Sequence, residues 1–190
     1  SNGLEFNSPE AIHLGAVDYF SDFLQRSNPV REVPDLSSLI SSVINDEDCV
    51  RLCGIPSLVE VKEALSTIPI NSSPGPDGFG AGFFMSCWEV VKVEVLEAIS
   101  EFFLSKRLPR FYSASFIVLI PKVDVPSGFD KFRPISLCSV FYKICSKIIV
   151  NRMTGFLPKM ISLEQGAFIP GRSIFENISL TQEMVHSLKR

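Results

Sequence analysis

Hydrophobic residues recur every three or four positions through most of this chain, which is the spacing of amphipathic helices. Ser8, followed by Pro9 and Glu10, is a typical helix start, and apolar residues continue at helical spacing as far as Leu24. Further helices are predicted over residues 36–44, 57–68, 83–106, 139–156 and 173–188. The chain is therefore expected to be mainly helical.

One segment follows a different pattern and predicts a β-hairpin. The apolar run Phe116–Ile120 stops at Pro121, and a turn containing Gly128 brings the chain back towards Pro134. A further short strand is expected over residues 166–169. Together these features predict an α+β fold that is predominantly helical and has a small antiparallel sheet.

The predicted hairpin carries cations at or beside its bend. Lys122 directly follows the first strand, and Lys131 and Arg133 lie on the returning segment. A guanidinium offers a planar set of donors and an ammonium offers a compact charge, so this fork is suited to holding a phosphate group. The alternative is that Arg133 forms an ordinary ion pair with Asp124 or Asp130 across the hairpin.

Charge is distributed unevenly along the chain, although the net charge is only −3. Residues 1–105 contain 5 basic and 16 acidic residues, a net charge of −11, whereas residues 106–190 contain 13 and 5, a net charge of +8. The basic half is also the half that contains the hairpin. Clustered cations of this kind favour a polyanionic partner.

Other kinds of site have little support in the sequence. The five cysteines are scattered, and His13 and His186 lie at opposite ends, so neither a zinc site nor a Ser/His/Asp triad is expected. No Walker-type or G-x-G-x-x-G loop is present. No apolar run approaches the ~20 residues of a membrane span, and no signal peptide is visible. We therefore expect an intracellular protein, nuclear or cytoplasmic, that is neither membrane-bound nor secreted.

Four blocks of sequence, in this order, resemble the reverse transcriptases of the non-LTR (LINE-type) retrotransposons of plants. The first is Pro-Gly-Pro-Asp-Gly-Phe at 74–79, and the second is the hairpin at 119–137. The third is Phe-Tyr-Lys-Ile-Cys-Ser-Lys at 141–147 with Asn-Arg-Met at 151–153, and the fourth is Gln-Gly-Ala-Phe-Ile-Pro-Gly-Arg at 165–172. Each block alone is weak, but four in the family's order are specific.

The resemblance implies a domain organisation. Residues 57–190 would form the fingers portion of a right-hand polymerase, truncated before the palm. Residues 1–56, where the likeness is faint, would form a helical linker or N-terminal extension. The loop at 74–78 has no cation, so it is interpreted as a structural bend rather than as a template contact.

The resemblance also implies roles for individual residues. Lys122 and Arg133 would bind the triphosphate of the incoming deoxynucleotide. The residues that would contact the RNA or DNA template–primer are Lys131, Lys143, Lys147, Gln165 and Arg172. For the two lysines at 143 and 147, which are four apart on one helix face, the alternative is a solvated face with no ligand.

The catalytic carboxylates of this family are expected to be missing. Its polymerases bind two divalent metals on palm aspartates, whereas this chain ends at Arg190, before the first of them would appear, and contains no Asp-Asp pair. The acidic run Asp46-Glu47-Asp48 precedes the fingers motifs and is interpreted as a solvated loop or helix end. No catalytic residue and no metal ligand is therefore assigned.

The sequence thus predicts a fragment of an RNA-directed DNA polymerase that binds template–primer and nucleotide but does not catalyse alone. No cofactor is expected in this chain, because Mg²⁺ is implied only for the full-length polymerase with its palm segment. The alternative is a degenerate or domesticated module that binds nucleic acid, or another protein, without chemistry.

Overall fold

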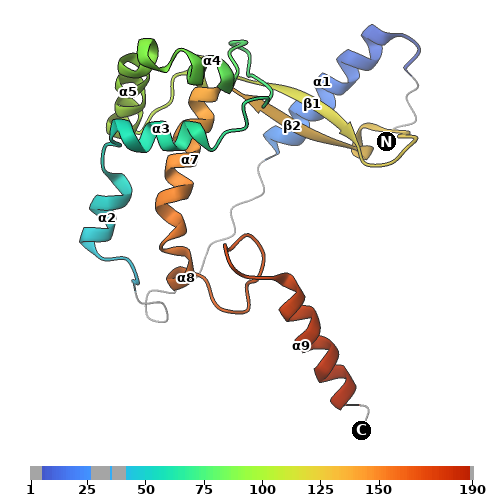
Figure 1. Ribbon diagram of the computed structural model, residues 1–190. Helices are drawn as coiled ribbons and strands as arrows, with labels where there is room; N and C mark the ends of the chain where they lie inside the picture. Colours follow the sequence, from blue (N-terminus) through green and yellow to red (C-terminus); the bar gives the residue numbers. More distant parts are fainter. Residues whose placement is uncertain (1–5, 27–34, 36–41, 189–190) are drawn as a thin grey trace.

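The computed structural model describes residues 6–26, 35 and 42–188. In these parts of the chain it is mostly helical, with one two-stranded antiparallel sheet, and this confirms the predicted fold class (Figure 1). The elements in chain order are α1 (Pro9–Gln25), α2 (Asp46–Cys53), α3 (Leu58–Ser66), α4 (Ala81–Ser86), α5 (Trp88–Ser105), α6 (Arg110–Ser113), β1 (Ser115–Pro121), the 3-10 turn η1 (Phe129–Lys131), β2 (Phe132–Cys138), α7 (Val140–Thr154), α8 (Leu157–Met160) and α9 (Ile174–Ser187).

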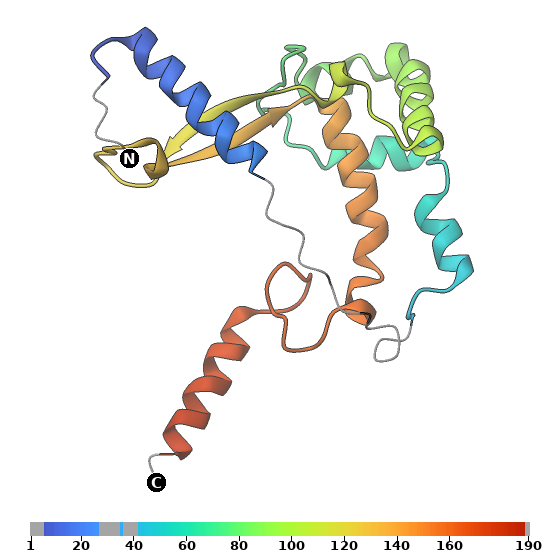
Figure 2. The same ribbon diagram turned by 180° about the vertical axis from the view of Figure 1, so that it is seen from behind.

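The hydrophobic core lies around the N-terminal half of α7, where α3, α4 and α5 gather (Figures 1 and 2). Apolar residues spaced by one turn on α7 face these helices, and each fully buried side chain stabilises the fold by about 1.5–3 kcal/mol. The Cys145 thiol belongs to this core, and burial raises its pKa to about 12, so it remains neutral. The buried residues of α7 are Val140, Phe141, Ile144, Cys145 and Ile148.

The predicted hairpin is confirmed. β1 and β2 pair in register from Ser115 opposite Cys138 to Pro121 opposite Phe132. The hairpin projects from the helical body, and α1 lies alongside it (Figures 1 and 2). Several of its side chains stay well exposed, for example Phe116 at 57%. Because an isolated two-stranded ribbon is marginal in water, its geometry depends on the elements at its two ends.

The base of the hairpin is fixed to the helical body through Ser139. Its hydroxyl donates to the carbonyl of Tyr112 at 3.1 Å and accepts from the N–H of Tyr142 at 3.2 Å, which caps α7. Gly75 packs directly against this junction, since a Cβ at position 75 would lie 2.4 Å from the Ser139 nitrogen. The proline- and glycine-rich loop at 74–78 therefore has the structural role that the sequence suggested.

Arg152 ties α7 to three other helices. Its guanidinium donates to both carboxylate oxygens of Glu60 on α3, at 2.7 and 2.8 Å. It also donates to the carbonyls of Leu52 and Gly54 at the end of α2, at 3.1 and 2.5 Å. The same group lies 4.9 Å from the centre of the Phe103 ring on α5. A side chain that is 12% exposed thus organises the α2–α3–α5–α7 junction.

The predicted helix boundaries hold at several positions and fail at others. α1 begins after Ser8, whose hydroxyl accepts from the N–H of Ala11 at 3.2 Å, as expected. The acidic run at 46–48 forms the capped first turn of α2, which agrees with a helix end. The helix expected over 83–106 is instead divided between α4 and α5, because the backbone of Cys87 (φ −97°, ψ 13°) leaves the helical region. Most of the helix expected over 36–44 lies outside the described residues.

The strand expected over residues 166–169 is not formed, and this prediction is wrong. Ala167 and Phe168 form a turn and Ile169 a bend, and Gly166 has no regular structure. Phe168 has a φ of 64° and Gly171 a φ of 79°, both in the left-handed region. A left-handed residue at position 168 interrupts an extended strand over 166–169, and Gly171 turns the chain again just beyond it.

The last helix, α9, extends away from the rest of the molecule (Figures 1 and 2). None of its residues is buried, and its apolar side chains are well exposed, such as Ile174 at 54% and Val185 at 48%. The helix predicted over residues 173–188 is thus formed, and its apolar face is not covered in the described part of the chain. In the described part of the chain, no helix is both long enough and apolar enough to cross a bilayer.

Replacing Arg152 with Ala should destabilise the protein by about 2–4 kcal/mol, because the carboxylate of Glu60 and two carbonyls lose their donor. The value is set below that of a fully buried pair because the Glu60 side chain is 30% exposed. Urea unfolding measures the change. As a control, Lys92→Ala removes a cation from the exposed Lys92–Glu89 pair and should have little effect. Equal losses in the two variants would contradict the role given to Arg152.

The Glu60 carboxylate should make the stability depend on pH. The hydrogen bond from Arg152 lowers the pKa of Glu60 below its usual 4.5, against the opposing effect of burial. A lowered pKa stabilises the folded state above the unfolded value of 4.5, and this contribution is lost as the pH falls through the folded value. Glu60→Gln should therefore be less stable than the parent near neutral pH, with the difference shrinking in acid. A difference that is constant over this range would contradict the pairing.

Candidate nucleic-acid interface

The tip of the hairpin is closed by hydrogen bonds from Lys122. Its backbone N–H donates to the carbonyl of Lys131 at 2.7 Å, and its ammonium donates to the carbonyl of Asp130 at 2.9 Å. The short turn η1 is in turn fixed by the N–H of Lys131, which donates to the carbonyl of Gly128 at 3.0 Å. Lys122 therefore shapes the tip and also contributes an exposed cation to it.

Lys131 and Asp130 form an exposed ion pair at the tip, 2.8 Å apart. The hydrogen bond between them lowers the pKa of the Asp130 carboxyl and raises the pKa of the Lys131 ammonium. Both groups consequently stay ionised at neutral pH, and the carboxylate partly neutralises the lysine. Lys131 is thus a weaker attractor of anions than its formal charge suggests.

Arg133 is the most available cation of the hairpin. The register places it opposite Ile120, two residues before Lys122, and its side chain is exposed. In the described part of the chain, its guanidinium has no hydrogen bond and no ion pair. The alternative of a pair with Asp124 or Asp130 is wrong: the described residues show neither pair, and Asp130 contacts Lys131 instead. The donors of Arg133 remain available for a ligand.

A groove of about 550 Å³ lies between the loop after α3, the strand β2 and one face of α7. The two predicted lysines of α7 line it in different ways. Lys143 donates to the carbonyl of Ser73 at 2.6 Å and to the hydroxyl of Ser72 at 3.2 Å, so it holds the loop after α3 against α7. Lys147 is half-buried and has no hydrogen bond or ion pair with any described residue. Hydroxyl groups of Ser72, Ser136, Tyr142 and Ser146 line the same groove.

Arg172 organises the loop between α8 and α9. Its guanidinium donates to the carbonyls of Ile161, at 3.2 Å, of Gln165, at 3.1 Å, and of Ser162. The Gln165 side-chain amide donates to the carbonyl of Ala167 at 3.2 Å. Gln165 and Arg172 were predicted to contact nucleic acid. In the structure their side-chain N–H groups donate to carbonyl groups of their own loop and hold its conformation.

That loop presents Phe168, a residue that the sequence analysis did not single out. Its side chain is 99% exposed, whereas its neighbour Ile169 is 8% exposed and anchors the loop. Its backbone φ of 64° is unfavourable for a residue with a Cβ. The exposure and the left-handed backbone of Phe168 could not be predicted from a single sequence, because the loop conformation depends on the contacts of Arg172 with three carbonyl groups.

The structure groups the predicted residues into three places. Lys122, Lys131 and Arg133 lie together at the hairpin tip, and the groove contains both lysines of α7. The two places are connected by β2, which carries Arg133 near one end and the groove residue Ser136 towards the other. Gln165 and Arg172 belong to a separate loop beyond α8. No group of three or more His, Cys, Asp or Glu residues suited to a metal ion occurs among the described residues.

Comparison with known proteins supports an origin in a transposable element. No protein-family model matches the chain. The chain is 29% identical over 192 residues to an uncharacterized 149 kDa protein of transposon TX1 from Xenopus laevis. The similarity covers the whole chain, and the chain spans 14% of the length of that protein. The resemblance noted in the four sequence blocks is thus accompanied by similarity to a transposon protein along the entire chain.

Replacing Phe168 with Gly should stabilise the protein by about 0.5–1 kcal/mol. A left-handed backbone costs a residue with a Cβ about 1–2 kcal/mol, and the greater freedom of Gly in the unfolded chain offsets part of the gain. Phe168→Ala keeps the Cβ and should leave stability nearly unchanged. Chemical unfolding of both variants separates backbone strain from side-chain exposure, and equal stabilisation by Ala would contradict the assignment to strain.

Proposed function

We propose that this chain is the fingers portion of an RNA-directed DNA polymerase from a LINE-type retroelement. It binds an RNA or DNA template–primer together with incoming deoxynucleotides. The observation that carries the proposal is the projecting hairpin, whose register brings Lys122, Lys131 and Arg133 to one tip and leaves Arg133 without a partner among the described residues. The order of the four sequence blocks and the similarity to a transposon protein support the same conclusion.

The chemistry of the tip suits a triphosphate. Arg133 would bind two phosphate oxygens with parallel N–H groups, which an ammonium cannot do. Lys122 gives one N–H to the Asp130 carbonyl and keeps further donors for a ligand. Cations at this position would neutralise the charge that develops on the leaving pyrophosphate.

The groove beside α7 suits the backbone of a nucleic-acid strand. Lys147 supplies a half-buried cation without a partner in the described structure, and surrounding hydroxyl groups can donate to phosphate oxygens. β2 runs from the hairpin tip to the groove. A nucleic-acid strand lying in the groove would therefore lead towards the nucleotide at the tip. Lys143 would contribute charge to this path while it holds the loop after α3.

This chain alone is expected not to polymerise DNA. A two-metal site needs carboxylates that converge on both ions. The sequence has no adjacent aspartate pair, and its acidic run at 46–48 forms the first turn of α2. In a full-length polymerase, which would act in the nucleus or the cytoplasm, a palm segment would supply these carboxylates and bind Mg²⁺.

One observation favours a second candidate, a protein-interaction module without nucleic-acid binding. The apolar residues of α9 are exposed on a helix with no buried residue, as a docking surface would be. The two candidates differ in their response to salt. Binding through several phosphates weakens steeply as salt rises, whereas an apolar interface does not.

Arg133→Ala should weaken binding of labelled single-stranded oligouridine about 5- to 150-fold, because charge-assisted hydrogen bonds contribute about 1–3 kcal/mol. Arg133→Lys should restore only part of the affinity. A salt titration should show a slope of log affinity against log salt that is smaller by roughly 0.7 in Arg133→Ala, the value for one phosphate contact on a single strand. Fluorescence anisotropy measures both quantities.

The matched control is Lys62→Ala, which removes one exposed cation from α3. It should change the affinity much less than Arg133→Ala. Lys122→Ala is a less specific variant, because it also removes the hydrogen bond that closes the tip. Equal effects of Arg133→Ala and Lys62→Ala, or binding that is indifferent to salt, would contradict nucleic-acid binding at the hairpin.

A further inference from the structure

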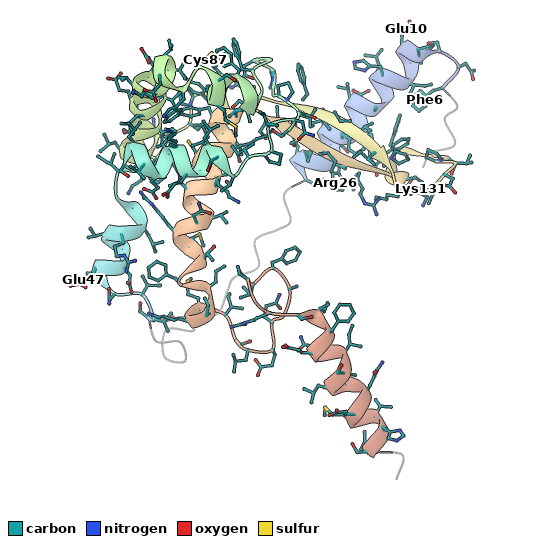
Figure 3. All side chains as sticks on the ribbon, viewed as in Figure 1. Phe6, Glu10, Arg26, Glu47, Cys87 and Lys131 are labelled. Carbon is teal, nitrogen blue, oxygen red and sulfur yellow. The ribbon has the colours of Figure 1, made fainter. Side chains whose placement is uncertain are left out.

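An aromatic cluster links the N-terminal segment to the hairpin tip. The ring of Phe129, the first residue of η1, lies 5.5 Å from the ring of Phe6 and 5.7 Å from that of Tyr19, measured between centroids. α1 runs beside the hairpin in both views (Figures 1 and 2). Phe6 and Lys131 lie in the same part of the molecule in Figure 3. We call Phe6, Tyr19 and Phe129 the tip cluster.

The turn that carries Phe129 is the turn that sets the positions of the tip cations. It contains Asp130 and Lys131, whose carbonyls accept the two hydrogen bonds of Lys122. Arg133 follows two residues later in β2. A displacement of the Phe129 ring would therefore move the backbone on which all three cations depend.

α1 contributes little to the hydrophobic core. Its only buried residue is Phe20, and apolar residues elsewhere on the helix are well exposed, such as Leu14 at 63% and Leu24 at 58%. Tyr19 of α1 instead contacts the tip, since its ring centre lies 5.7 Å from that of Phe129. The contact that distinguishes α1 is thus its contact with the hairpin tip.

Gly15 provides the space in which Phe6 packs. A Cβ at position 15 would lie 2.4 Å from the far end of the Phe6 ring, closer than real Cβ atoms approach other atoms. Gly inside a helix is unfavourable relative to Ala by intrinsic propensity. The glycine here therefore costs helix stability and in return lets the ring of Phe6 reach Phe129.

We infer that α1 belongs to the polyanion-binding site, with Phe6 and Tyr19 acting as positioning residues that hold Phe129 and so orient Lys131 and Arg133 towards phosphate groups. A two-stranded ribbon is marginal by itself, and binding to a mobile tip would include the cost of ordering it. The tip cluster removes part of that cost before the ligand arrives. This inference rests on the proposed function, because it assigns α1 a role in the same site.

The deciding variant is Gly15→Ala, which changes neither the hairpin nor any charge. It should displace the Phe6 ring and weaken binding of labelled oligouridine by about 2- to 10-fold, the factor expected for ordering one side chain on binding. Its melting temperature should stay the same or rise, because Ala favours the helix. A purely structural role would instead lower the melting temperature. The matched control is Gly155→Ala. An added Cβ at position 155 meets open space, so this substitution should not affect binding.

Double mutants show whether the effect passes through the cluster and the arginine. In a Phe6→Ala background, Gly15→Ala should have no further effect, because the ring that it displaces is absent. Combined with Arg133→Ala, Gly15→Ala should lose most of its effect, because it acts by orienting that guanidinium. Fully additive effects in both pairs would overturn the inference.

The outcomes for the inference and for the proposed function are separate. If Arg133→Ala weakens binding of oligouridine and Gly15→Ala does not, the role of α1 is wrong and nucleic-acid binding at the hairpin stands. If Arg133→Ala has no effect, the proposed function itself fails. A lower melting temperature in Gly15→Ala, together with unchanged binding by Phe6→Ala, would assign the cluster to packing alone and overturn the inference.

Discussion

The pairing of Arg152 with Glu60 is the interaction on which the rest of the structure depends. It joins α7 to α3, and the same guanidinium holds the end of α2 and lies over a ring of α5. Because β2 continues into α7 through Ser139, the orientation of α7 also sets the base of the hairpin. The position of the hairpin tip therefore depends on a partly buried contact near the C-terminal end of α7.

Basic residues of the C-terminal half differ in whether their hydrogen-bond donors are already used inside the protein. Arg152, Lys143 and Arg172 donate to carbonyl groups inside the protein and hold helices or loops in place. Arg133 and Lys147 have no such partner in the described structure. The net charge of +8 over residues 106–190 therefore overstates the charge available to a ligand, since cations that already donate to carbonyl groups of the protein have fewer donors left for binding.

Local patterns predicted elements well where one residue type dictates the backbone. Pro121 and Pro134 marked the hairpin correctly, and Ser8 marked the start of α1. Local patterns failed where the backbone conformation depends on contacts with other segments. The apolar run at 166–169 has a strand-like composition, yet the carbonyl contacts of Arg172 fold it into turns with Phe168 in the left-handed region. The aromatic run after residue 83 is helical on both sides of Cys87, and its composition gives no sign of the break.

The sequence by itself determined that this chain is mainly helical with one hairpin, that cations concentrate in its second half, and that its motifs resemble those of a reverse transcriptase. Only the tertiary structure decided which cations are available. Arg152 meets Glu60 across 92 residues of sequence, and Lys143 meets Ser72 across 71. Spacing along a helix shows which face a side chain occupies, but its hydrogen-bond partner is set by whichever distant segment packs against that face. The division between structural and available cations is for this reason a property of the fold.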